Sequence, residues 1–269
     1  MPPFDEVSYS ESACIAAITD YYKLLISMYL DETYVEWPPE GGWPQITPGA
    51  FGVRGKSDKV ISLLRQIPYL RELDTTDEWE QPHGVPYDNF CNWKNEFQNG
   101  AGGDSWQISD LKMMTEGYYF DGTTEHMIGL MIGGRNATFA IIDTQYGIVY
   151  WPECDDTISN ESKQERVWGE PEEISCDKEG NLRCEPAWTI NDFFTMLREQ
   201  LLDLKWLPIN SRQVVGPYTE WDEDSELQSI LKGIYWGHGW PDEEEYKKEE
   251  CIRLIEQTTE ERCPDFSLA

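Results

Sequence analysis

Three short apolar runs in the middle of the chain constrain its fold more than any other feature of the sequence. They cover residues 126–132, 138–143 and 147–151, and only a few residues separate each run from the next. Connections of this length join antiparallel strands, because two parallel strands need a crossover of about a dozen residues or more. The sequence therefore predicts a central antiparallel β-meander.

Segments with a helical spacing of apolar residues flank the predicted meander on both sides. They cover residues 10–30, 57–67, 189–204, 223–235 and 242–257. A polar side chain can cap the start of three of these helices: Ser10 or Ser12 for the first, Ser57 or Asp58 for the second, and Thr189 or Asn191 for the third. We therefore predict an α+β fold class, in which N-terminal and C-terminal helices flank the central meander.

The chain of 269 residues is long enough for one large domain. Residues 152–186 are rich in acidic side chains and poor in apolar ones, which is typical of a surface segment. We predict a single α+β domain over residues 1–269, with an acidic surface insertion at about 152–186. A helical C-terminal extension is expected from about residue 208.

The charge balance limits which molecules the protein can bind. The chain has 51 Asp and Glu against 21 Lys and Arg, which gives a formal net charge of −30. Such a field repels the phosphates of nucleic acids and anionic membrane surfaces, and it attracts cations. We therefore predict a basic protein or a cationic small molecule as partner, and no nucleic acid or membrane. The alternative is that the charge serves only solubility.

The cysteines and the first residues bear on where the protein is found. Residues 1–12 carry neither a basic start nor an apolar run, so no secretory signal is recognised there. The seven cysteines are odd in number and irregularly spaced. This pattern is typical of reduced thiols, and it predicts a cytoplasmic location.

No motif in the sequence predicts a cofactor. Residues 50–57 match a relaxed phosphate-binding loop with Lys56 in the lysine position, but no apolar strand precedes them. We interpret them as a loop that leads into a capped helix. His83, His126 and His238 are not spaced as a metal site. The sequence thus predicts no cofactor and no metal, and it leaves any catalytic residue unassigned.

Several aromatic and ionisable residues are candidates for binding. The tryptophans in or beside predicted loops are Trp37, Trp43, Trp151, Trp236 and Trp240. Aromatic rings beside acids suit a cationic ligand or a protein interface, although they also suit loops held to the core. Asp143 ends an apolar strand and alternatively begins a turn. The predicted binding set is Trp37, Trp43, His126, Asp143, Trp151, His238 and Trp240.

Part of the chain resembles the SMI1/KNR4 (SUKH) superfamily. The likeness lies in residues 140–143 and 147–151, an acidic spacer, and residues 188–194, which open a helix. Residues 37–44 and 55–61 resemble a filamentous-fungal lineage of unassigned function. The superfamily resemblance implies a binding module, since bacterial members neutralise toxins, often basic nucleases, and fungal members act as regulatory or scaffold proteins.

Two functions follow as the leading hypotheses, and a nucleotide hydrolase is a third, which requires a buried strand before Ala50. The first is an acidic binding or regulatory module that engages a cationic partner without catalysis. The alternative is an enzyme of fungal specialised metabolism, acting on a cationic, arginine-like molecule in an acidic, aromatic-lined pocket. A deep pocket with a carboxylate beside His126 or His238 favours the enzyme, whereas a shallow surface rimmed by acids favours the binding module.

Overall fold

The computed structural model describes residues 2–49, 55–75, 80–86, 89–99, 105–132, 139–152, 154–167, 182–216 and 226–262. Within them, a four-stranded antiparallel sheet has the order β4-β6-β7-β8. Its first three strands are β4 (Met127–Gly129), β6 (Ile141–Asp143) and β7 (Ile148–Tyr150). The predicted α+β fold with a central antiparallel meander is therefore confirmed. Residues 133–138, which hold part of the predicted β-run and its connection, lie outside the described residues.

The fourth strand of the sheet was not predicted. Residues Ala187–Thr189 form β8, in which Trp188 lies opposite Val149 of β7. The helix α6 (Ile190–Leu202) starts directly afterwards, and the Thr189 hydroxyl accepts a hydrogen bond from the Asp192 amide at 3.2 Å. Because Thr189 both ends the strand and caps the helix, the predicted helix start was correct while the preceding strand was missed.

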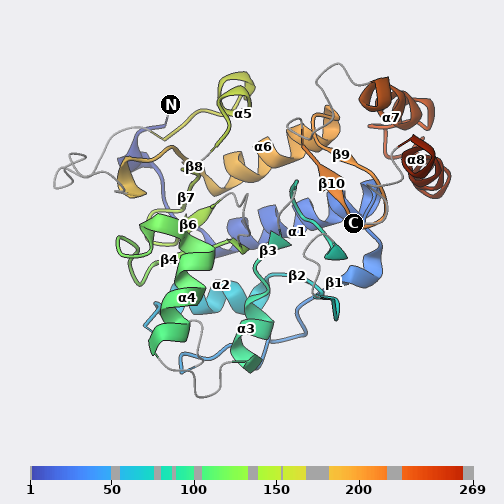
Figure 1. Cartoon of the computed structure of the whole chain (residues 1–269). Coiled ribbons are helices and arrows are strands. Elements are labelled where there is room, and N and C mark those ends of the chain that lie inside the picture. The colour runs from blue at the N-terminus through green and yellow to red at the C-terminus, as the bar shows by residue number, and fades with distance from the viewer. Residues whose placement is uncertain are drawn as a thin grey trace.

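The two helices α1 (Glu11–Met28) and α6 run across the molecule side by side (Figure 1). Of the two predicted cap residues of α1, Ser10 is the one that caps the helix, by accepting a hydrogen bond from the Ala13 amide at 3.3 Å. Between the two helices, the rings of Tyr21 and Phe194 lie 5.8 Å apart. The helix α2 (Asp58–Gln66) also follows its prediction and packs against α1. These three helices bury the side chains that the apolar spacing indicated.

Shorter elements complete the described structure. The single-turn helices are η1 (Phe4–Glu6), η2 (Glu32–Tyr34), η5 (Gly117–Tyr119) and η6 (Leu182–Cys184). Three strand pairs are antiparallel: β1 (Val35–Glu36) with β2 (Tyr69–Leu70), β3 (Asn89–Phe90) with β5 (Met131–Ile132), and β9 (Leu207–Pro208) with β10 (Val214–Val215). The remaining helices before the C-terminal extension are α3 (Trp93–Asn99), α4 (Ser105–Glu116) and α5 (Asp156–Glu161).

Two of these elements differ from the sequence prediction. No helix was predicted between residues 67 and 126, but the structure contains α3 and α4 there. Met113 and Met114 of α4 are exposed, so the apolar residues of this helix do not follow a single face. The predicted insertion at 152–186 contains α5, and its residues 153 and 168–181 lie outside the described part.

The C-terminal extension consists of α7 (Glu226–Gly237) and α8 (Lys248–Arg262), which lie together at one end of the molecule (Figure 1). The second helix was predicted to begin at residue 242, but α8 begins at Lys248, and residues 243–245 form a turn before it. There the Asp242 side chain accepts a hydrogen bond from the Glu244 amide at 3.0 Å, which favours a turn over a helix. Tyr235 and Ile255 belong to the same buried cluster as the core of α1.

The structure corrects the prediction that all seven cysteines are thiols. Cys184 is disulfide-bonded, whereas Cys14, Cys91, Cys154 and Cys251 are thiols. Irregular spacing in the sequence does not reveal which cysteines the fold brings together. Among the helices described, none is both long and apolar enough to cross a membrane. The cytoplasmic location stays a prediction.

Candidate functional site

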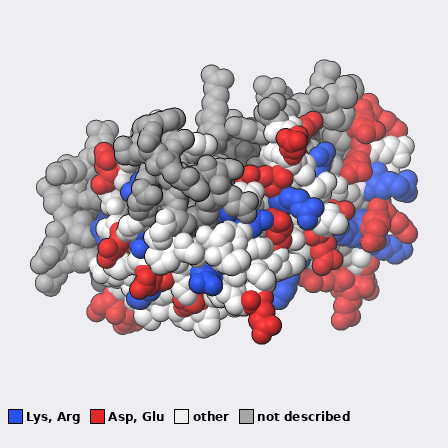
Figure 2. Space-filling view, turned by 90° about the horizontal axis from the view of Figure 1, so that it is seen from below, with Lys and Arg blue, Asp and Glu red and all other residues white. Residues whose placement is uncertain are grey.

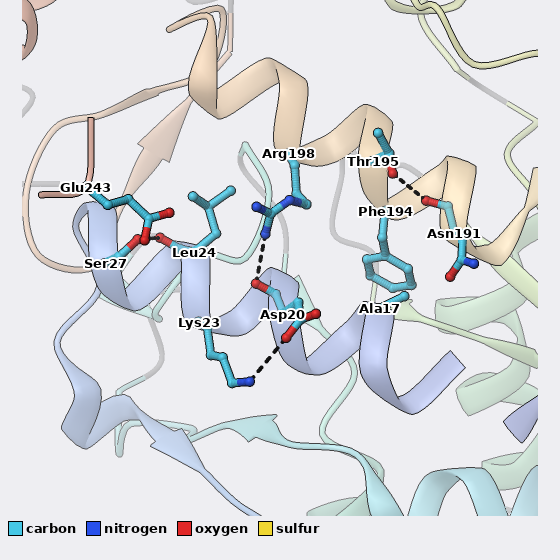
Figure 3. A pocket seen from close by; sticks show the side chains of 10 residues that line it. All are labelled: Ala17, Asp20, Lys23, Leu24, Ser27, Asn191, Phe194, Thr195, Arg198 and Glu243. Atoms are coloured by element: carbon cyan, nitrogen blue, oxygen red, sulfur yellow. Dashed lines mark hydrogen bonds and ion pairs between the residues drawn. The ribbon is translucent and has the colours of Figure 1, made fainter. Parts of the chain in front are cut away.

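A groove on the surface separates α1 from α6 and has a volume of about 460 Å³ (Figure 3). Its floor is apolar and includes Leu24 of α1 and Phe194 of α6, both of which are almost completely buried. The rims are polar and carry hydroxyl, amide and charged groups from both helices. Glu243, from the turn between α7 and α8, closes one end of the groove. The groove is thus built where three distant parts of the chain meet.

The charged groups of the groove are unequally paired. Lys23 lies 3.1 Å from the Asp20 carboxylate, so these two charges of α1 neutralise each other. Arg198 extends from α6 and donates a hydrogen bond from Nη1 to the backbone carbonyl oxygen of Asp20 at 3.0 Å. Neither Arg198 nor Glu243 forms an ion pair with any residue in the described ranges. One cation and one carboxylate therefore stay available in the groove.

Of the predicted site residues, His126 and Asp143 are brought close together. The His126 carbonyl oxygen accepts hydrogen bonds from the Thr144 amide at 2.8 Å and the Thr144 hydroxyl at 2.9 Å, where β4 meets β6. Asp143 is fully buried, and its Oδ2 lies 3.7 Å from Nη1 of Arg183. Burial raises the pKa of Asp143, although the Gln145 amide and Arg183 act in the opposite direction.

Three of the predicted tryptophans hold loops against the core. The Trp43 indole donates a hydrogen bond to the Ile67 carbonyl oxygen at 2.9 Å. Trp151 is 3% exposed, and its ring lies 5.4 Å from the ring of Phe193. Trp240 is 2% exposed and donates to the Leu201 carbonyl oxygen at 3.2 Å. The alternative reading of these residues, that they are part of the core, matches their observed positions.

The other predicted residues lie apart from one another. Trp37 follows β1 and is 37% exposed. His238 follows α7, and its Nδ1 lies 2.7 Å from the Ile234 carbonyl oxygen. The predicted set therefore does not form one site. Two smaller cavities of about 20 and 200 Å³ occur as well, and neither they nor the groove are lined by His126, Asp143 or His238.

Carboxylates crowd the end of the molecule that α7 and α8 form, with some lysine and arginine side chains among them (Figure 2). The exposed acids of the turn and of the first turn of α8 are Asp242, Glu243, Glu244, Glu245, Glu249 and Glu250. Trp236, near the end of α7, is 59% exposed, and residues 237–241 connect it to this turn. The Trp236 carbonyl oxygen accepts a hydrogen bond from the Gly239 amide at 3.2 Å. An exposed indole and a dense group of carboxylates thus share one end of the fold.

The lysine of the relaxed phosphate-binding loop has another role. Lys56 forms a buried ion pair with Glu116, with Nζ and Oε1 2.9 Å apart. Residues 40–49 contain turns and no strand, and residues 50–54 lie outside the described part. Lys56 is therefore occupied inside the protein, in agreement with our interpretation of the motif as a loop leading into α2.

Neither the arrangement of possible metal ligands in the described residues nor the comparison with known proteins indicates another site. Within the described ranges, no group of three or more His, Cys, Asp or Glu side chains is arranged to hold a metal ion. No protein-family model matches the chain, and no curated protein or solved structure matches it either. The groove residues Asp20, Arg198 and Glu243 were not predicted from the sequence, because none stands in a recognisable motif.

Proposed function

We propose that this protein is an acidic binding module that engages a basic protein at the end formed by α7 and α8. The observation that carries the proposal is the position of Trp236. Its indole is 59% exposed at the end of α7, and the loop that follows α7 carries the exposed carboxylates of Asp242, Glu243, Glu244 and Glu245. Tryptophan is rarely so exposed, and an exposed indole beside acids suits lysine and arginine side chains. Tryptophan is also enriched among the residues that dominate protein interfaces.

The shape of α7 supports a partner at this place. Leu227, Leu231 and Tyr235 are buried against the rest of the protein. The opposite face exposes Ser229, Gly233 and Trp236, which recur every three or four residues. Small residues beside one large indole leave room for a partner's chain to lie along the helix. The charge of the neighbouring turn selects a partner that is rich in lysine and arginine.

The groove between α1 and α6 supports binding more than catalysis. Phe194 is the one aromatic residue among those that line it, and Lys23 and Arg198 add positive charge. An acidic pocket with aromatic walls, which the enzyme hypothesis requires, is therefore not what this cavity offers. The resemblance to the SMI1/KNR4 (SUKH) superfamily implies a binding role as well. A basic protein is the partner class that agrees with a formal net charge of −30.

Binding of a fluorescent arginine-rich peptide to the full chain tests the proposal. Fluorescence anisotropy is measured at rising salt concentration, and the affinity is expected to fall with salt. Trp236→Ala is expected to weaken binding at least about tenfold. Trp37→Ala is the matched control, since Trp37 is also exposed but belongs to the loop after β1. Equal affinity of the two variants contradicts the proposal.

Two double charge reversals distinguish binding at a local site from attraction by the overall charge of the protein. Glu244→Lys with Glu245→Lys, and Asp5→Lys with Glu6→Lys, each change the formal net charge from −30 to −26. The first pair lies in the turn after α7 and the second in η1. Only the first pair is expected to weaken binding strongly. Equal losses mean that the net charge alone attracts the peptide, and tight binding of RNA at physiological salt overturns the proposal.

A further inference from the structure

We propose that the groove between α1 and α6 binds a short peptide with free ends, whose carboxylate pairs with Arg198 and whose ammonium group faces Glu243. This site shares only Glu243 with the acidic surface at Trp236, and the inference does not depend on the function proposed for that surface. The groove volume of about 460 Å³ lies within the range of about 300–1,000 Å³ that is usual for small-molecule sites.

Arg198 is already oriented for a carboxylate. Its hydrogen bond from Nη1 to the Asp20 carbonyl oxygen, at 3.0 Å, holds the guanidinium across the groove toward α1 (Figure 3). The Nε and Nη2 groups make no hydrogen bond to any described residue. These two donors form the planar fork that binds a carboxylate with two parallel hydrogen bonds. A ligand carboxylate therefore finds a preorganised partner here.

The charges of the groove favour a ligand that carries both signs. The Asp20 carboxylate is paired with Lys23, so the remaining charges are one cation, Arg198, and one carboxylate, Glu243. Glu243 lies near Ser27, at a different place along the groove from Arg198 (Figure 3). A purely anionic or purely cationic ligand leaves one of these charges opposed by its own sign. A zwitterionic peptide complements both.

The remaining lining of the groove suits a peptide backbone. The floor of Leu24 and Phe194 offers an apolar contact for small side chains. The Asn191 side chain extends from α6 at the groove, and its amide has no hydrogen-bond partner among the described residues. The Thr195 hydroxyl donates to the Asn191 carbonyl oxygen at 2.8 Å and can still accept. These groups can pair with the amides and carbonyls of a bound peptide.

Isothermal titration of the full chain with trialanine tests this site. The free-ended tripeptide is compared with its C-terminal amide and with its N-acetyl form. Removal of either charge is expected to weaken binding about tenfold, because the charge-assisted hydrogen bonds of that end of the peptide are lost. Equal affinity for the three peptides, or no binding of trialanine at 10 mM, overturns the proposal.

Variants assign the two charges to their residues. Arg198→Gln and Arg198→Lys are both expected to lose affinity for free-ended trialanine, since lysine keeps the charge but lacks the planar fork. Glu243→Gln is expected to bind the free and N-acetyl forms equally. Arg71→Gln is the control, because Arg71 is an exposed arginine outside the groove. Thermal unfolding without peptide identifies any variant that is misfolded. If Arg198→Gln is misfolded, trialanine binding by Arg198→Lys and Glu243→Gln tests the proposal instead.

The outcome is independent of the proposed protein-binding function. Trp236→Ala is expected to leave trialanine binding unchanged, because Trp236 does not line the groove. Full affinity for trialanine in both Arg198 variants overturns the assignment of the carboxylate, whatever the arginine-rich peptide does. Loss of trialanine binding in Trp236→Ala also contradicts two separate sites.

Discussion

The ammonium group of Lys56 lies 2.9 Å from Oε1 of Glu116, and the two side chains are only 4% and 0% exposed. Nζ of Lys56 also donates to the Met127 carbonyl oxygen at 2.6 Å, and the Thr123 hydroxyl donates to the second Glu116 oxygen at 2.5 Å. The pair thus joins the start of α2 to the end of α4 and to the sheet. Burial lowers the pKa of Lys56, because the charged form loses water, whereas Glu116 acts in the opposite direction.

Removing the charge of one partner of this pair is expected to lower the unfolding free energy much more than removing both charges together. Glu116→Gln leaves the Lys56 charge buried without compensation, which costs about 3–5 kcal/mol of unfolding free energy. The double change of Lys56→Met with Glu116→Leu is expected to recover most of that loss, since no buried charge remains. Urea unfolding measures both. Lys23→Gln, in the exposed pair with Asp20, is the control and should cost about 1 kcal/mol or less.

A second lysine joins the C-terminal extension to the first helix. Nζ of Lys248 donates to the carbonyl oxygens of Ile26 at 2.6 Å and of Leu30 at 2.8 Å, at the C-terminal end of α1. A cation at this end also complements the helix dipole. We expect Lys248→Ala to lower the unfolding free energy by about 1–3 kcal/mol, because two carbonyl groups lose their partner. The exposed neighbour Lys247→Ala should change it by about 0.5 kcal/mol or less. Equal losses of unfolding free energy in Lys248→Ala and Lys247→Ala contradict the role of Lys248 in joining α8 to α1.

Two tryptophans near the end of α7 are expected to differ sharply in their effect on stability. Trp240 is buried, and its ring lies 5.0 Å from the ring of Tyr246. Trp240→Ala should therefore cost about 3–5 kcal/mol, as is usual for loss of a large aromatic side chain from a core. Trp236→Ala should leave the thermal midpoint nearly unchanged, because its ring is mostly in water. A large loss of stability in Trp236→Ala means that this indole is part of the core.

Buried thiols make stability depend on pH in the alkaline range. Burial raises the pKa of Cys14 to about 12 and that of Cys251 to about 11, from an ordinary value of 9.0. Above pH 9 the unfolded thiols ionise while the folded ones keep their protons, so the folded state holds more protons. The unfolding free energy therefore falls as pH rises from about 9 toward 11–12, by up to about 1.4 kcal/mol per pH unit and thiol.

Replacement of one thiol isolates this effect from that of the buried tyrosines. Cys14→Ala is expected to flatten the fall in unfolding free energy between about pH 9 and pH 10.5, as measured by urea unfolding at several pH values. Ile18→Val, one turn further along α1, is the control, because it lowers stability without removing a titrating group. A parallel pH dependence in Cys14→Ala and wild type contradicts the role of the thiol.

Features that depend on neighbouring residues were predicted correctly. The hairpin of β6 and β7 follows from two apolar runs and a short turn, and α1 and α6 follow from their apolar spacing and their caps at Ser10 and Thr189. The strand β8 was missed because it runs directly into α6, and the helices α3 and α4 were missed because their irregular apolar pattern gives weak helical periodicity. The candidate groove was missed entirely.

The sequence by itself determined the fold class, the faces of the main helices that are buried, and the sign of the surface field, because these depend on local spacing and on composition. Only the tertiary structure decided that Arg198 reaches the Asp20 carbonyl of α1, or that Lys56 pairs with Glu116, 60 residues further along the chain. Periodicity shows which face of an element is apolar, but it does not show which other element covers that face. Contacts between distant residues, and the cavities between them, therefore arise only once the elements are packed.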